Sequence, residues 1–155
     1  MLFAKTYNFD YIQSIDSTVT FISLPDWTCN DANYAVFNFS RFTQIESIEI
    51  GNDSFCSVKT FNINGLNKLK SLKIGKNSFT QNKNKHDCDY SKSFNISNCE
   101  SLESIQISAY SFSDFAGGFV LKQLPNLQSI QIGNEDSDSW NFRYCSFTIM
   151  SNESF

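Results

Sequence analysis

The sequence has little excess charge, one histidine and no long apolar run, and each of these shortages excludes a class of function. The net charge is only −4 over 155 residues, and the lysines and arginines form no stripe, so phosphate-driven binding of nucleic acid is not expected. No run of about 18 apolar residues occurs, and the N-terminal segment MLFAKTYNFDY lacks the apolar stretch of a signal peptide. We therefore expect no membrane insertion by this chain and a cytoplasmic location. The cell surface is the alternative if the chain is a fragment of a longer protein.

Motifs of catalysis are also missing. His86 is the only histidine, so no Ser/His/Asp arrangement can be argued, and no GxGxxG, P-loop, HExxH or GxSxG pattern occurs. Residues 86–89 (HDCD) offer too few zinc ligands, and residues 134–139 (NEDSDS) lack the glycine and the distant glutamate of an EF-hand. We expect no enzyme activity, no cofactor and no metal site. The five cysteines are irregularly spaced and include no CxxC pair, so we expect mostly reduced thiols.

One phrase, by contrast, recurs along the chain. The stretches IESIEIGNDSF, LKSLKIGKNSF, LESIQISAYSF and LQSIQIG share the pattern LxSIxIGxxSF. The first apolar residues of the successive copies are Val19, Ile45, Leu69, Leu102 and Leu127. They lie 26, 24, 33 and 25 residues apart, and the longest spacing carries an insertion. Self-similarity at a period of about 20–50 residues is the signature of a repeat architecture.

Within LxSIxI, apolar and polar residues alternate, which is the period of a strand with one buried face. The positions predicted to point inward are Ile48, Ile50, Leu72, Ile74, Ile105, Ile107, Ile130 and Ile132. The positions predicted to point outward are Ser47, Glu49, Ser71, Lys73, Ser104, Gln106, Ser129 and Gln131. A short strand cannot bury one face alone, so we expect the copies to stack as a parallel sheet over one continuous core. Gly51, Gly75 and Gly133 follow three of the strands and predict turns with positive φ.

A return segment, FxIxxLxxL, separates the strand phrases and is too short and too strand-like for a long helix. Its first residues are Phe37, Phe61, Phe94, Phe119 and Phe147. Phe55, Phe79 and Phe112 end the strand phrases and are predicted to stack. We interpret these eight phenylalanines as core. The expected fold is a mainly β repeat solenoid of about five units, with a parallel sheet and short strand or turn returns.

The phrases LxxIxIxxxSF and CxxLxSIxI (99–107) resemble leucine-rich repeats, in particular the irregular BspA-like type of microbial and unicellular-eukaryote surface proteins. The resemblance covers roughly residues 19–150. Phenylalanine and isoleucine replace many leucines, and Pro25 and Ser108 stand at the positions of the turn glycine. The resemblance implies a curved or twisted solenoid with a protein-binding face and no catalytic residues.

The array is expected to be irregular at both ends. Residues 1–18 fit the pattern poorly and are interpreted as an atypical cap or partial repeat, and residues 19–155 as the leucine-rich-repeat array. The last nine residues align with the start of a unit, and Phe155 falls where Leu102 begins its strand phrase. We therefore expect an array truncated at the C-terminus, whose open sheet edge is a candidate for self-association.

Two functions agree with this pattern. The first is a protein–protein interaction scaffold that binds another protein, of unknown identity, through the outward strand positions and the loops. Trp140, Phe142 and Tyr144 are candidate anchors because aromatic residues dominate interface hot spots; alternatively, they are core of the next unit. The second function is a structural or adhesive segment of a longer cell-surface repeat protein.

Overall fold

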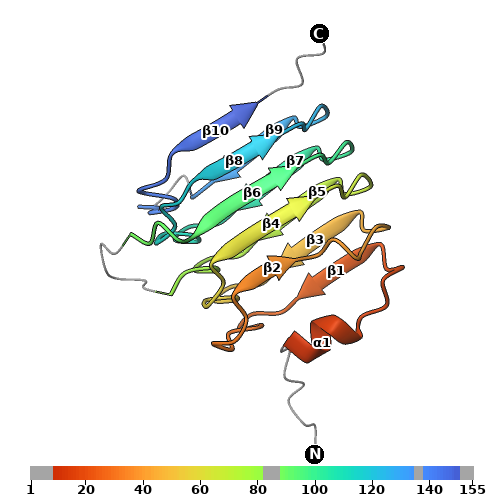
Figure 1. Cartoon of the computed structure of the whole chain (residues 1–155), viewed down its shortest axis with the longest axis horizontal. Coiled ribbons are helices and arrows are strands. Elements are labelled where there is room, and N and C mark those ends of the chain that lie inside the picture. Colours follow the sequence, from red (N-terminus) through yellow and green to blue (C-terminus); the bar gives the residue numbers. More distant parts are fainter. Residues whose placement is uncertain (1–8, 82–87, 135–137, 151–155) are drawn as a thin grey trace, which may run out of the picture.

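The computed structural model describes residues 9–81, 88–134 and 138–150, which form a coil of short strands (Figure 1). One helix, α1 (Phe9–Ser14), precedes them. The strands are β1 (Phe21–Leu24), β2 (Val36–Asn38), β3 (Ser47–Ile50), β4 (Thr60–Asn64), β5 (Ser71–Ile74), β6 (Ser93–Ser97), β7 (Ser104–Ile107), β8 (Phe119–Lys122), β9 (Ser129–Ile132) and β10 (Phe147–Met150). The alternating phrases thus become strands, as the sequence predicts.

The strands form two parallel sheets that face one another. The first sheet has the order β1-β3-β5-β7-β9, and the second has the order β10-β8-β6-β4-β2. Parallel strands need a crossover connection, and here the crossover from one strand to the next is a strand of the other sheet (Figure 1). The predicted mainly β solenoid of about five coils is therefore confirmed, and the return segments form its second sheet.

Aromatic columns fill the space between the sheets. Along the second sheet, Phe37, Phe61 and Phe94 stack with ring centroids 4.6 Å apart. A second column begins at Phe55 and Phe79, whose rings are 5.1 Å apart and nearly parallel, and rings of the two columns meet edge to face. Offset stacking and edge-to-face contacts are the arrangements that aromatic pairs favour. The phenylalanines predicted as core are buried, except for Phe147 on the last strand.

The turns that leave the first sheet are built from left-handed residues and close glycine contacts. The non-glycine residues Asp53, Phe55, Asn77 and Phe79 have φ between 53° and 57°. Positive φ occurs at Gly133, as predicted, but not at Gly51 or Gly75. The prediction was wrong for those two, because what they require is space. A Cβ at Gly75 would lie 2.5 Å from the carbonyl carbon of Gly51, and one at Gly51 would lie 2.4 Å from a backbone nitrogen.

A buried hydroxyl column ties consecutive turns together. The backbone amide of Thr28 donates to Ser54 Oγ at 3.0 Å, that of Ser54 donates to Ser78 Oγ at 3.2 Å, and that of Ser78 donates to Ser111 Oγ at 3.0 Å. All four residues are fully buried. A buried amide without a partner is costly. The serine in each SF pair therefore has a structural role, because its hydroxyl accepts the hydrogen bond of a backbone amide from the preceding turn.

Candidate interaction surface

The outer face of the first sheet gathers all eight residues predicted to point outward. Strand register places Ser47, Ser71, Ser104 and Ser129 opposite one another in one column. The same register places Glu49, Lys73, Gln106 and Gln131 in a second column. All eight side chains are exposed or half-buried. We call these two columns the outer face; an extended row of strand side chains suits contact with a macromolecule more than enclosure of a small ligand.

Strand β1 extends both columns by one row. Phe21 pairs with Ser47 and Ser23 pairs with Glu49, and the Phe21 side chain is 52% exposed. Sequence reasoning missed Phe21 because its phrase, TFISLPD, has proline at the place of the turn glycine and phenylalanine at the place of the first serine of the other copies. The signal was the alternation of Phe21, Ile22, Ser23 and Leu24, which matches ESIEI in period. An exposed aromatic residue at the rim of a polar face is a natural contact point for a partner.

The serine column is partly occupied by its own interactions. Ser47 Oγ and Ser71 Oγ lie 2.8 Å apart and share a hydrogen bond. A hydroxyl bonded to its neighbour is less available to a partner, so this pair acts as a link between strands. The second column, which begins at Glu49, offers longer side chains and is the better candidate for specific contacts.

Charges on and beside the outer face compensate one another. Glu49 lies opposite Lys73 in the register, and Lys70 Nζ donates to Glu46 Oε2 at 2.7 Å at the base of the strands. The hydrogen bond from Lys70 lowers the pKa of Glu46, and the same bond raises the pKa of Lys70. Exposed pairs of this kind contribute little stability. Their mixed signs also mean that long-range charge would not select a partner.

The three aromatic candidates Trp140, Phe142 and Tyr144 do not act as a set. Phe142 is buried and stacks on Phe112 at 4.9 Å, so it continues the column of Phe55 and Phe79. The prediction of an exposed anchor is wrong for Phe142, because its turn repeats the geometry of the earlier SF turns; the alternative, core of the next unit, describes it. Trp140 and Tyr144 are 38% and 36% exposed.

Trp140 and Tyr144 belong to a small aromatic and cationic patch at the solenoid edge. The Arg143 guanidinium lies 5.2 Å from the Trp140 ring centroid and 5.5 Å from that of Tyr144. Tyr110 contacts Trp140 from the preceding turn, with ring centroids 6.4 Å apart. Cation–π contacts of this kind hold the side chains in place. The patch lies on a turn between the two sheets, away from the strands of the outer face.

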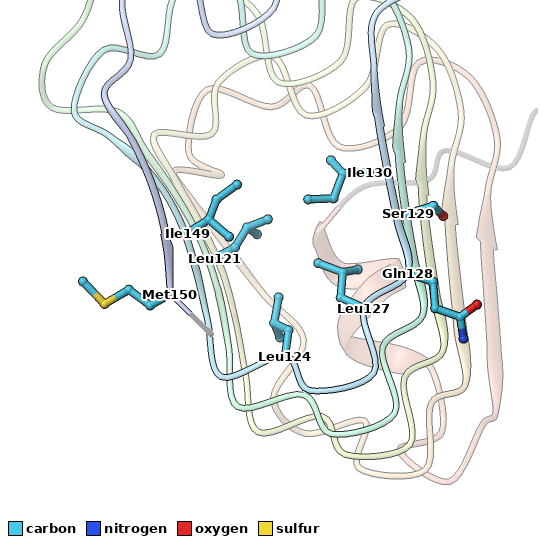
Figure 2. Close-up of a pocket in the computed structure, with 8 residues that line it drawn as sticks. All are labelled: Leu121, Leu124, Leu127, Gln128, Ser129, Ile130, Ile149 and Met150. Carbon is cyan, nitrogen blue, oxygen red and sulfur yellow. The ribbon is translucent and has the colours of Figure 1, made fainter. Parts of the chain in front are cut away.

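An apolar groove of about 340 Å³ opens at the β9 and β10 end of the solenoid (Figure 2). Its lining residues are Leu121, Leu124, Leu127, Gln128, Ser129, Ile130, Ile149 and Met150. Ile130 and Ile132 are 38% and 36% exposed, although the sequence predicts inward positions. The inward direction of these side chains was predicted correctly. They are nevertheless exposed, because β9 has a neighbouring strand on one side only.

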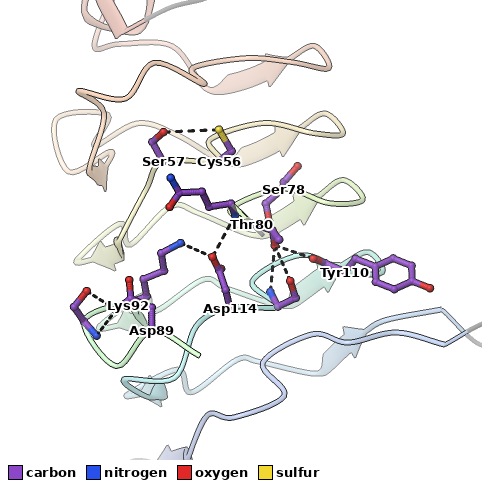
Figure 3. A network of polar contacts seen from close by, with 11 residues as sticks. Cys56, Ser57, Ser78, Thr80, Asp89, Lys92, Tyr110 and Asp114 are labelled. Atoms are coloured by element: carbon purple, nitrogen blue, oxygen red, sulfur yellow. Dashed lines mark hydrogen bonds and ion pairs between the residues drawn. The ribbon is translucent and has the colours of Figure 1, made fainter. Parts of the chain in front are cut away.

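A buried polar cluster anchors the long insertion between β5 and β6 (Figure 3). Lys92 Nζ donates to Asp114 Oδ2 at 2.6 Å, and the two side chains are 1% and 4% exposed. Thr80 Oγ1 donates to the Tyr110 carbonyl at 2.8 Å. These contacts join the two ends of the insertion to the next coil. Residues 86 and 87 of the HDCD stretch, and residues 135–137 of the acidic 134–139 stretch, lie outside the described residues.

Remaining chemistry is sparse in the described part of the chain. The five cysteines are free thiols, and burial raises the pKa of Cys29 to about 12, so this thiol stays protonated and unreactive at neutral pH. No group of three or more potential metal ligands occurs within residues 9–81, 88–134 and 138–150. In the same ranges, no helix has the length and apolar character needed to cross a membrane.

Comparison of the chain with protein-family models, with curated proteins and with solved structures found no match.

Proposed function

We propose that this chain is a protein–protein interaction scaffold of leucine-rich-repeat type, which binds another protein through the outer face of its first sheet. The observation that carries the proposal is the register that aligns eight outward side chains into two adjacent columns. Repeat solenoids use such extended faces for binding.

The partner expected for this face is a folded protein surface with neutral polar and apolar groups. Glu49 and Lys73 compensate each other, while Gln106 and Gln131 add amides that both donate and accept hydrogen bonds. Phe21 adds an exposed ring at one end. Binding through such a face should depend little on salt, because no net charge is concentrated there.

The test is affinity capture with a matched pair of variants. Gln106→Arg places a bulky charge at an exposed position in the middle of the outer face. Val36→Arg places the same charge on the second sheet, at a residue that is 52% exposed. A partner of the outer face is expected to bind Gln106→Arg about tenfold or more weakly and to bind Val36→Arg as it binds the wild type. If every captured protein tolerates Gln106→Arg, the outer face is not the binding site.

A further inference from the structure

The two ends of the first sheet differ although they carry equivalent inward positions. At the β1 end, Ile22 and Leu24 are each 3% exposed. At the β9 end, the equivalent residues Ile130 and Ile132 are 38% and 36% exposed. The core is therefore sealed at one end of the solenoid and open at the other.

The second sheet shows the same difference. Phe37 on β2 and Phe39 directly after it are fully buried, whereas the equivalent residues Phe147 and Ile149 on β10 are 53% and 64% exposed. β9 and β10 are also edge strands, with a hydrogen-bonded neighbour on one side only. Figure 2 looks into this end, where Ile130 and Ile149 point into the space between the two sheets. An apolar end with two unpaired edges is a template for further strand pairing.

The sealed end is closed by α1. Ile12 of this helix is 1% exposed and packs on the core. Arg41 donates to the carbonyl oxygens of Ile12 and Ile15, at 2.9 and 2.6 Å, and so holds the chain across the end. β1 and β2 are edge strands too, but at this end the inward residues Ile22 and Leu24 stay buried. The open end therefore matches another open end better than it matches the sealed end, and like-with-like association gives a closed pair and not a fibre.

The described strands of the open end and the turn before β9 carry no formal charge. Residues 123–134 and 144–150, which include β9, β10 and the turn before β9, contain no Asp, Glu, Lys or Arg, although the chain carries 28 such residues counted as 12 basic and 16 acidic. A charged partner would gain nothing here. The open end of a second copy would approach without repulsion between like charges. It would also bring the same apolar side chains to the contact.

We propose that the open end binds the open end of a second copy of this chain and forms a closed two-fold dimer. A two-fold axis normal to the sheets brings β9 against β9 and β10 against β10 of the other copy in antiparallel orientation. Such a rotation keeps the inward side chains facing inward, so the columns that end at Ile130 and Ile149 continue into the partner. The groove of Figure 2 then lies at the centre of the interface, and antiparallel pairing satisfies the free strand edges.

Sedimentation velocity of the full chain over a range of concentrations tests this proposal. The expected result is a monomer–dimer equilibrium that ends at twice the chain mass of 17.7 kDa. Ile149→Lys is expected to weaken the dimer about tenfold or more, because the added ammonium group would have to be buried at the interface. Ile149 is 64% exposed, so this variant should keep the fold, which circular dichroism would check.

Val36→Lys is the matched control. Val36 is also an exposed apolar residue on an edge strand, but it lies at the sealed end and points away from the core. This variant is expected to dimerise like the wild type. Three results would each overturn the proposal: a monomer at concentrations up to about 0.5 mM, a series of larger species with no defined dimer, or an equal loss of dimer in Val36→Lys. Higher salt should leave the dimer intact, since no ion pair forms it.

Discussion

Gly75 rests on the backbone of Gly51 in the turn that leaves the first sheet. A Cβ at Gly75 would lie 2.5 Å from the Gly51 carbonyl carbon and 2.7 Å from the amide nitrogen of Asn52. Neither contact can be relieved by rotating a side chain, because both partners are backbone atoms. The turn amide of Gly75 also donates to the Ile50 carbonyl at 2.8 Å. Any displacement of this turn therefore disturbs the pairing of two coils.

Gly75→Ala is expected to lower the free energy of unfolding by about 2 kcal/mol or more, because the new methyl group overlaps neighbouring backbone. Urea denaturation followed by circular dichroism would measure the change. Gly65→Ala is the control: Gly65 has φ of +73° but no atom within 4 Å of an added Cβ. Its cost should be about 1 kcal/mol from backbone strain alone. Equal losses of unfolding free energy in both variants would show that the φ angle, and not the close approach of backbone atoms, sets the cost of the substitution.

Residue-level predictions from the sequence succeeded where the cause is local. Alternation fixes which side chains of a strand face the core, so Ile48 and Leu72 were assigned correctly. The reason for Gly75 depends on the coil beneath it, and the burial of Phe142 depends on the ring of Phe112. No local pattern carries information of that kind, so these two assignments needed the structure.

At the level of the elements, the long insertion between β5 and β6 is held by one buried ion pair. Lys92 and Asp114 come from different coils, and Asp114 Oδ2 also accepts the Gln81 amide at 3.3 Å. The Lys92 ammonium lies 5.7 Å from the Phe115 ring centroid. Two buried charges stabilise a fold only when each satisfies the other. The pair therefore fixes where the insertion re-enters the coil rather than adding much net stability.

A double-mutant cycle separates these effects. Asp114→Leu leaves the Lys92 ammonium buried without its carboxylate, and we expect a loss of about 3–5 kcal/mol in the free energy of unfolding. Lys92→Met should cost a similar amount. The double variant Lys92→Met/Asp114→Leu is expected to lie within about 1 kcal/mol of the wild type. Thermal and urea denaturation measure all four proteins, and additive losses in the double variant would contradict a coupled pair.

The strands themselves were predictable, and their burial at the array end was not. Alternating phrases of four to six residues mark strands wherever turn residues bound them, which is why the first sheet follows from the repeat. The returns were predicted only as short strands or turns, and the structure shows that they form a second sheet. Burial of β9 and β10, however, depends on a neighbour on each side. Ile130 and Ile149 hold inward positions whose equivalents in the central coils are buried, but both are exposed at the edge of the array.

Across the whole molecule, strand pairing joins each coil only to the coils beside it. No pairing links the first coil to the last. The stability of such an array is close to a sum over coils and their interfaces. Central coils have two interfaces and end coils have one, so opening should begin at an end.

Hydrogen exchange is expected to show this gradient. Amides of β5 and β6 should exchange most slowly, and those of β9 and β10 most rapidly, because β9 and β10 have a hydrogen-bonded neighbour on one side only and no described element lies over them. The experiment should use Ile149→Lys, which keeps the open end free of a second copy. The order would be read by mass spectrometry of peptic fragments. Protection of β10 equal to that of β6 would mean that the array opens as one cooperative unit.

In-register stacking also affects how such a gene can change. Neighbouring coils place the same kind of side chain at matched inward positions, as Phe61 and Phe94 or Ile74 and Ile107 show. Recombination between two copies of the repeat would therefore delete or insert one complete coil and leave a continuous interior. The outward residues are under no such constraint, so each recombination would also change the exposed surface. Lineages of this chain can thus vary in length by whole coils while the pattern of the interior is inherited unchanged.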